Sequence, residues 1–208
     1  MFLGAILVSK SRIKESLEEI RLHGRGGQGV VLYSELIARA ALYEGSFARS
    51  FPWFGIARRG APVTAFVVMG EGDKITRSMV YNPKYVVVLD PQLHKVMPGV
   101  TRGIRIGGVY IQNSTKTPDE LLEELELDTK LSVIATIDAT GIAMKYMGVP
   151  IPNIVMLGAF ARVTNLITFD SAVKAVKARF PKDAWENYLK CLEAGYENIR
   201  VEVLEDGE

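Results

Sequence analysis

Apolar runs and segments with helical periodicity alternate along most of this 208-residue chain. The apolar runs predicted to form strands are residues 20–23, 63–69, 85–89, 109–113 and 131–136. Helices are predicted over residues 29–44, from Thr117, from Asp138, and over 153–162, 171–180 and 183–196. This alternation is typical of a sheet with helices on its faces. We therefore predict an α/β fold with a single doubly wound, mostly parallel sheet and flanking helices.

Three segments qualify this picture. Residues 63–69 and 75–79 flank a glycine-containing turn and are predicted to form a β-hairpin. Residues 1–19 lack the pattern and are interpreted as an N-terminal extension, whereas residues 20–208 form one domain. The helix at 153–162 is almost wholly apolar and contains small residues such as Gly158, so it lies either at the centre of the domain or under another subunit.

The first predicted strand runs into a glycine-rich turn that opens the first helix. The turn consists of Gly24, Arg25, Gly26, Gly27, Gln28 and Gly29. Glycine permits positive φ and lets an anion approach the backbone, and the helix start adds about half a positive charge. The turn is therefore suited to a phosphate, a carboxylate or the backbone of a partner. A tight strand-to-helix turn with no ligand is an equally valid interpretation of the glycines alone.

A nicotinamide site would need an acidic residue about 20 positions after the turn, to hold a ribose hydroxyl. Glu44 comes too early, at the end of the helix, and the later candidate is Arg49. An arginine suits a phosphate better than a ribose diol. The pattern therefore disfavours a dinucleotide-dependent dehydrogenase.

Residues 47–62 are aromatic and basic, with clean periodicity of neither kind. Phe51, Trp53 and Phe54 surround Pro52, and Arg58 and Arg59 follow. A long connection of this composition favours a binding or interface segment. The alternative is that the aromatic rings cover the end of the sheet while the arginines are solvated.

Asp90 follows the buried run at 85–89 and is expected at the carboxyl edge of the sheet, where open α/β sheets bind ligands. It either contributes to a site there or caps the next turn.

Composition excludes several classes of function. The net charge of +1 gives no electrostatic case for nucleic acid or a membrane surface. One cysteine, Cys191, supplies too few thiolates for an iron–sulfur cluster, and His23 and His94 are too far apart in sequence for a metal motif. No secretory signal or membrane span is recognised, so we expect a cytoplasmic protein.

No nucleophile–base pair or familiar catalytic motif is present. The residues that stand out are cationic: Arg25, Arg49, Arg58 and Arg59. Such a set binds and orients an anion but transfers neither protons nor electrons by itself. The sequence thus indicates a subunit that holds a phosphorylated ligand or a partner, with the reactive cofactors elsewhere.

Several ordered blocks of sequence resemble the gamma subunit of 2-oxoacid:ferredoxin oxidoreductases of the pyruvate and 2-ketoisovalerate type. The resemblance extends from Ile20 to about Asn198, and the blocks lie at residues 23–29, 51–62, 82–90, 138–140 and 150–159. An indolepyruvate-type relative shares the fold, but the segment Arg58-Arg59-Gly60-Ala61-Pro62 favours the pyruvate and ketoisovalerate side.

The resemblance implies that the chain works only in an assembly with alpha, beta and delta subunits, which reduces ferredoxin. That assembly converts a 2-oxoacid and coenzyme A to acyl-CoA and CO2. Thiamine diphosphate, Mg2+ and [4Fe–4S] clusters are expected on the partner subunits. Coenzyme A is expected to contact this chain at the glycine turn (Gly24, Arg25, Gly26, Gly27, Gln28 and Gly29) and at Arg58 and Arg59. Two alternatives remain: a purely architectural subunit of the same complex, and a free-standing Rossmann-type nucleotide-binding protein.

Overall fold

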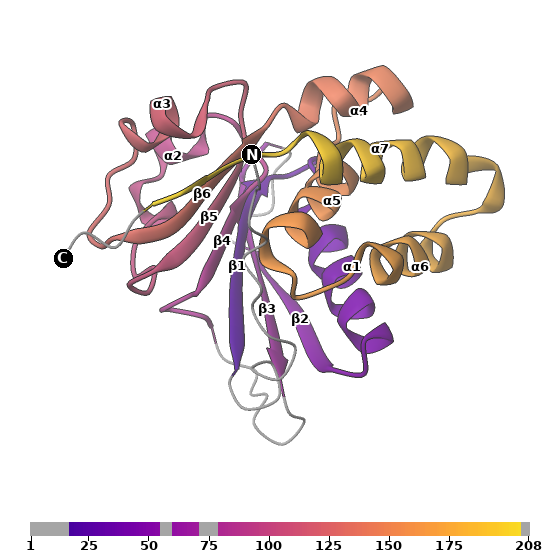
Figure 1. The fold of residues 1–208 in the computed structure, drawn as a ribbon, viewed down its shortest axis with the longest axis horizontal. Coiled ribbons are helices and arrows are strands. Elements are labelled where there is room, and N and C mark those ends of the chain that lie inside the picture. Colours follow the sequence, from indigo (N-terminus) through magenta and orange to yellow (C-terminus); the bar gives the residue numbers. More distant parts are fainter. Residues whose placement is uncertain (1–16, 55–59, 71–78, 205–208) are drawn as a thin grey trace, which may run out of the picture.

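The computed structural model describes residues 17–54, 60–70 and 79–204 of the chain (Figure 1). Seven strands form one sheet in the order β2-β3-β1-β4-β5-β6-β7. Their bounds are β1 Glu18–Arg25, β2 Phe47–Phe54, β3 Pro62–Gly70, β4 Tyr85–Val88, β5 Gly108–Asn113, β6 Leu131–Ile137 and β7 Arg200–Val203. Strands β1, β4, β5 and β6 are parallel, whereas β3 and β7 run antiparallel to their neighbours. The predicted α/β fold with a mostly parallel sheet is confirmed.

Helices cover both faces of this sheet (Figure 1). Their bounds are α1 Val30–Tyr43, α2 Leu93–Val96, α3 Pro118–Leu122, α4 Ala139–Met147, α5 Asn153–Thr164, α6 Phe169–Arg179 and α7 Trp185–Asn198. Two short 3-10 helices span Pro98–Val100 and Lys182–Ala184. One core joins α1, α4, α5, α6 and α7 to one face, and a second core joins α2 and α3 to the other. The strand alternation explains this division, because Val87 belongs to the first core and Val86 and Val88 to the second.

Helix α5 lies at the centre of the domain, which decides between the two positions expected for it. Ten of its residues are buried, and α7 crosses it at close range. A Cβ built on Gly158 would lie 1.9 Å from the Leu192 carbonyl oxygen, and one on Gly195 would lie 1.9 Å from that of Val155. The two glycines therefore allow the helix backbones to touch.

The expectation that residues 47–62 form a long connection was wrong for the first half of this segment. Residues Phe47–Phe54 form edge strand β2, which pairs with β3. Pro52 is compatible with this position, because an edge strand has a side that needs no ladder hydrogen bonds. The hairpin in the described part of the chain is therefore β2–β3. The second arm of the predicted hairpin, residues 75–79, lies almost wholly outside the described residues.

Candidate functional site

The candidate site lies where β1 and β4 end side by side. These neighbouring strands are parallel, yet α1 after β1 packs on one face and α2 after β4 on the other. Open α/β sheets form a crevice at such a switch point, outside the carboxyl ends of the strands. The glycine turn and Asp90 both lie at this edge.

The glycine turn begins later than the sequence pattern indicates. Strand β1 continues through Gly24 and Arg25, which pair with Val63 and Pro62 of β3. A Cβ on Gly24 would lie 2.5 Å from Val30 Cγ2, so a larger residue there would push α1 away from the strand. Gly27 (φ +103°) and Gly29 (φ +78°) adopt the left-handed region. Gly29 is the N-cap of α1.

Part of the turn satisfies its own hydrogen bonds. The Arg25 amide donates to Gln28 Oε1 (2.7 Å), and the Gln28 amide donates to the Arg25 carbonyl (3.1 Å). The Gly26 amide donates to the Ala61 carbonyl (2.9 Å). Helix α1 then starts without a side-chain cap. Its first-turn amides, beginning at Val30, are therefore the donors that the turn offers to a ligand.

The Asp90 side chain, which follows β4, accepts three hydrogen bonds, two of them from the glycine turn. Its Oδ2 accepts from Arg25 Nε (3.1 Å) and from Gln28 Nε2 (2.9 Å), and its Oδ1 accepts from the Gln92 amide (3.0 Å). The Asp90 side chain is 10% exposed and that of Arg25 is 32% exposed. Asp90 therefore caps its own turn, as one of the two interpretations expected, and it also holds Arg25 and Gln28 of the glycine turn.

Arg58 and Arg59 lie outside the described residues, but the residues that follow them are described. The Gly60 amide donates to the Gly26 carbonyl (3.3 Å), and Arg25 Nη1 donates to the Gly60 carbonyl (3.3 Å). Together with the bond from Gly26 to Ala61, these contacts hold the end of the β2–β3 connection against the glycine turn.

His23, which directly precedes the turn, is buried and hydrogen-bonded to Arg21. Arg21 Nε donates to His23 Nε2 (2.9 Å), so that nitrogen carries no proton, and Nδ1 lies 3.3 Å from Thr64 Oγ1. Burial, reinforced by the Arg21 charge, lowers the pKa of His23 to about 3. Its ring is a neutral structural element.

Two other polar side chains at this edge, Asn113 and Asp138, form hydrogen bonds within the protein. The Asn113 side chain donates to the Leu89 carbonyl and accepts from the Ala139 amide, while Asp138 caps α4 through the Gly141 amide. Cys191 is buried, and burial raises the pKa of its thiol to about 11. Among the described residues, no group of His, Cys, Asp and Glu is arranged to hold a metal ion.

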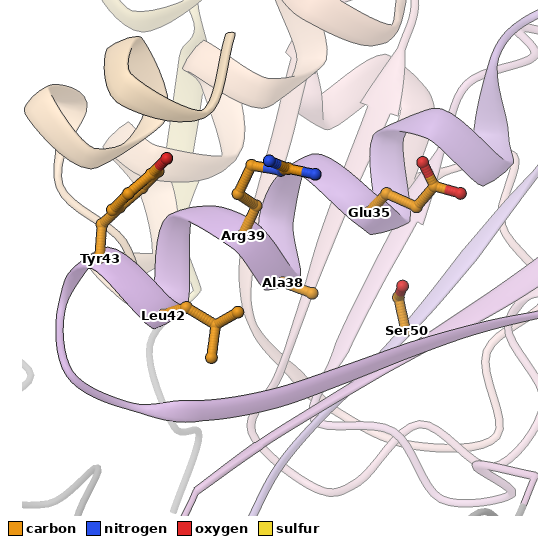
Figure 2. Close-up of a pocket in the computed structure, with 6 residues that line it drawn as sticks. All are labelled: Glu35, Ala38, Arg39, Leu42, Tyr43 and Ser50. Atoms are coloured by element: carbon orange, nitrogen blue, oxygen red, sulfur yellow. The ribbon is translucent and has the colours of Figure 1, made fainter. Parts of the chain in front are cut away.

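A groove of about 470 Å³ lies between helix α1 and edge strand β2 (Figure 2). It is lined by Glu35, Ala38, Arg39, Leu42, Tyr43 and Ser50. Its residues come from the later turns of α1 and from edge strand β2. Among the described residues of the predicted site, which are Gly24 to Gly29, none lines it.

Sequence reasoning missed one residue of the site, Asn153. This first residue of α5 contacts Gly29, since a Cβ on Gly29 would lie 2.4 Å from Asn153 Nδ2. Asn153 stood in one of the blocks that carried the family resemblance, but the sequence gives no signal that it meets the glycine turn.

Comparison with known proteins decides the family. The family model described as pyruvate ferredoxin/flavodoxin oxidoreductase matches residues 19–198. The chain belongs to this family. The gamma subunit common to the pyruvate and ketoisovalerate oxidoreductases of Thermococcus kodakarensis is 42% identical over 183 residues, which is 88% of this chain and 97% of that protein. Pyruvate synthase subunit PorC of Methanothermobacter thermautotrophicus is 44% identical over 181 residues, covering 87% and 95%.

Solved structures agree with the family assignment. Pyruvate oxidoreductase subunit PORC of Thermotoga maritima superposes with a TM-score of 0.78 at 34% identity, covering 90% of this chain and 99% of that one. A 2-oxoglutarate:ferredoxin oxidoreductase from Magnetococcus marinus, solved with coenzyme A bound, shares the fold at 16% identity (TM-score 0.65, 88% of this chain and 31% of that one). Within the described residues, no helix has both the length and the apolar character that crossing a bilayer requires.

Proposed function

We propose that this chain is the gamma subunit of a 2-oxoacid:ferredoxin oxidoreductase of the pyruvate and ketoisovalerate type. In that reaction the bond between the carboxylate and the carbonyl carbon breaks and CO2 leaves. The acyl group forms a thioester with the sulfur of coenzyme A, a proton is released, and two electrons reduce two oxidised ferredoxins. The support is the family membership and the naming of relatives above 40% identity as subunits of such enzymes.

In the proposed complex, which is cytoplasmic, the reactive cofactors lie on other subunits. This chain has one cysteine, whereas a [4Fe–4S] cluster needs about four thiolates. His23 is held neutral, and the Cys191 thiol is buried. We therefore place thiamine diphosphate, Mg2+ and the clusters on alpha, beta and delta partners, and the contact with ferredoxin on the assembled complex.

The contribution proposed for this chain is to bind coenzyme A, whose pyrophosphate and 3′-phosphate need cationic and amide donors. The observation that carries this proposal is the pair of hydrogen bonds between Gly26 and the Gly60–Ala61 backbone. Arg58 and Arg59 immediately precede Gly60 in the sequence. Arg25 and the uncapped start of α1 complete a cationic edge.

A reconstituted complex tests this contribution. Arg25→Ala and the double change Arg58→Ala with Arg59→Ala are expected to raise KM for coenzyme A about tenfold while kcat stays within about twofold. Arg39→Ala, an exposed arginine on the far part of α1, is the matched control and is expected to leave both constants unchanged. An unchanged KM in complexes of normal subunit composition would remove coenzyme A from this chain.

Two observations favour a second candidate function, that of a purely architectural subunit. The Arg25 guanidinium is already engaged by Asp90 and Gly60, and Trp53 exposes 55% of its surface beside the same edge. Aromatic residues and arginine are enriched at the centres of protein interfaces. In this case the same variants would weaken co-purification with the partners and leave KM for coenzyme A unchanged.

A further inference from the structure

The outer face of α1 carries exposed apolar side chains. Leu42 is 56% exposed and Tyr43 is 47% exposed at the end of this helix, and Phe47 is 60% exposed at the start of β2. Leu42 and Tyr43 also line the groove between α1 and β2 (Figure 2). Single apolar residues on a surface need no explanation, but several that gather in one place indicate an interaction site.

Helix α1 is unusually poor in charge for a helix with an open face. Both α1 and α7 have 14 residues, but α7 has four charged residues whereas α1 has two, Glu35 and Arg39. A helix face that stays in water is normally rich in charged residues. The composition of α1 therefore indicates that another molecule covers its outer face.

The two charges on α1 are spaced for an ion pair within the helix but do not form one. Glu186 and Lys190, which are also four residues apart, are paired on α7. Within residues 17–54, 60–70 and 79–204, the side chains of Glu35 and Arg39 have neither an ion-pair nor a hydrogen-bond partner. Both residues line the groove (Figure 2), so their charges are available to a partner.

The side chains on the outer face of α1 recur at helical spacing and form one stripe, here called the outer stripe. It consists of Val31, Leu32, Glu35, Arg39, Leu42 and Tyr43. The first two residues are partly exposed, and the other four are exposed. The outer stripe is symmetric about Ile37, because its charged residues lie two positions to either side and its apolar residues lie five and six positions to either side.

This symmetry has a direct consequence for a pair of identical helices. When two copies of α1 lie antiparallel about a two-fold axis at the level of Ile37, a residue before Ile37 faces the residue equally far after it in the other copy. Glu35 then faces Arg39, and Leu32 faces Leu42. The outer stripe is therefore complementary to itself in both charge and apolar character.

We propose that the outer stripe is a docking surface for a second copy of this chain, with the two α1 helices packed antiparallel about a two-fold axis. Two ion pairs lie at the centre of the contact, and apolar side chains flank them at both ends. An interface between identical subunits requires this self-complementarity. A partner of a different sequence would require no symmetry about Ile37.

Charge-reversal variants of the full-length chain test the arrangement, with molar mass measured by sedimentation equilibrium from micromolar to millimolar concentration. The unaltered chain is expected to form a dimer as its concentration rises. Glu35→Arg sets arginine against arginine, and Arg39→Glu sets glutamate against glutamate. Each variant alone is therefore expected to raise the dissociation constant of the dimer about tenfold or more. An equimolar mixture of the two variants is expected to restore the dimer, because the arginines of one chain then face the glutamates of the other.

A third variant tests the apolar part of the contact. Leu42→Lys is expected to raise the dissociation constant about tenfold or more, because the contact would bury an ammonium group without a partner. Met144→Lys, the same type of change at a 48% exposed residue of α4, is the matched control and should leave the dimer unchanged. All altered side chains are exposed, so every variant is expected to keep the Tm of the unaltered chain within a few degrees.

Three results would overturn the inference. One is an unaltered chain that stays monomeric at millimolar concentration. Another is a mixture of the Glu35→Arg and Arg39→Glu chains that dimerises no better than either variant alone. The third is protection of the outer stripe from hydrogen exchange only when other subunits are added, because a different chain would then cover it.

The test is separate from that of the proposed function. It measures the association of this chain with itself, whereas the proposed function is tested by the kinetics of coenzyme A. Arg39→Ala removes an ion pair of this contact but no donor of the glycine turn, so it remains the control for those kinetics. A dimer that behaves as expected while Arg25→Ala leaves KM unchanged would support this inference and remove coenzyme A from the chain.

Discussion

Arg25 at the end of β1 and Asp90 just after β4 form an ion pair, with Nε and Oδ2 3.1 Å apart. The carboxylate is nearly buried and also accepts a hydrogen bond from Gln28, so it fixes both ends of the glycine turn relative to β4. The cation at the site is therefore pre-oriented and partly neutralised before any ligand arrives. If an anion binds at this edge, we expect backbone amides and the remaining positive charge of Arg25 to hold it together.

Replacing Asp90 by asparagine is expected to lower the free energy of unfolding by about 1–3 kcal/mol, because a carboxylate that accepts three hydrogen bonds is lost. Urea unfolding of the full chain measures the change. Glu193→Gln, an exposed change on α7, is the control and should alter stability by less than about 0.5 kcal/mol. Equal effects of the two changes would mean that the hydrogen bonds of Asp90 contribute nothing to stability.

His23 is expected to make the fold sensitive to acid. Its pKa is about 3 in the folded chain and about 6.5 when unfolded, so the unfolded state binds the extra proton. Stability is therefore highest above pH 6.5 and falls as pH decreases toward 3, with a loss from this group of about 2 kcal/mol between pH 7 and pH 5. His23→Gln keeps an acceptor for Arg21 but does not titrate, so its loss over this interval should be smaller by about that amount. Identical losses in urea unfolding at the two pH values would show that His23 is not held neutral.

The contact between α5 and α7 is expected to tolerate no side chain at Gly158. Gly158→Ala places a Cβ against the Leu192 carbonyl, so the helices must separate, and we expect a loss of about 3 kcal/mol or failure to fold. Gly99→Ala is the matched control, because a Cβ there meets nothing within 4 Å. Thermal unfolding of both variants decides the point, and a Gly158→Ala variant as stable as the control would contradict the described packing.

Cys191 is expected to react with iodoacetamide only when the chain unfolds. The thiol is buried and its pKa is raised to about 11, so almost no thiolate is present or accessible at pH 8. Mass spectrometry of native and urea-unfolded samples should find alkylation only in the second. Rapid alkylation of the native chain would show that α7 opens easily.

The sequence predicted the elements whose signals are local. The unbroken apolar run at Tyr85–Val88 is a central buried strand, and α3 begins after Thr117 as predicted, where Thr117 and Glu120 form a capping box. Gly29 and Gly45 delimit α1, which spans nearly the predicted residues, and both glycines have positive φ. In each case the residues that determine the element are its own or its immediate neighbours.

The elements that were missed depend on contacts distant in sequence. Strand β2 contains Pro52 and no regular alternation, and it is a strand because β3 pairs with it. Strand β7 is short and lies at the other edge, where pairing with β6 holds it. The ion pair between Arg25 and Asp90 joins residues that are 65 positions apart in the sequence. No local pattern reports such a contact, which is why the glycine turn was predicted while the side chain that orients it stayed undecided.

The central claim is that the glycine turn binds coenzyme A within the assembled enzyme. Hydrogen–deuterium exchange of the whole complex, with and without coenzyme A, tests it most directly. We predict that peptides covering residues 24–32 and the start of α5 at Asn153 exchange more slowly when coenzyme A is present, while the α1 groove at Leu42 and Tyr43 is unaffected. Protection confined to the partner subunits, with no change at residues 24–32, would contradict the account.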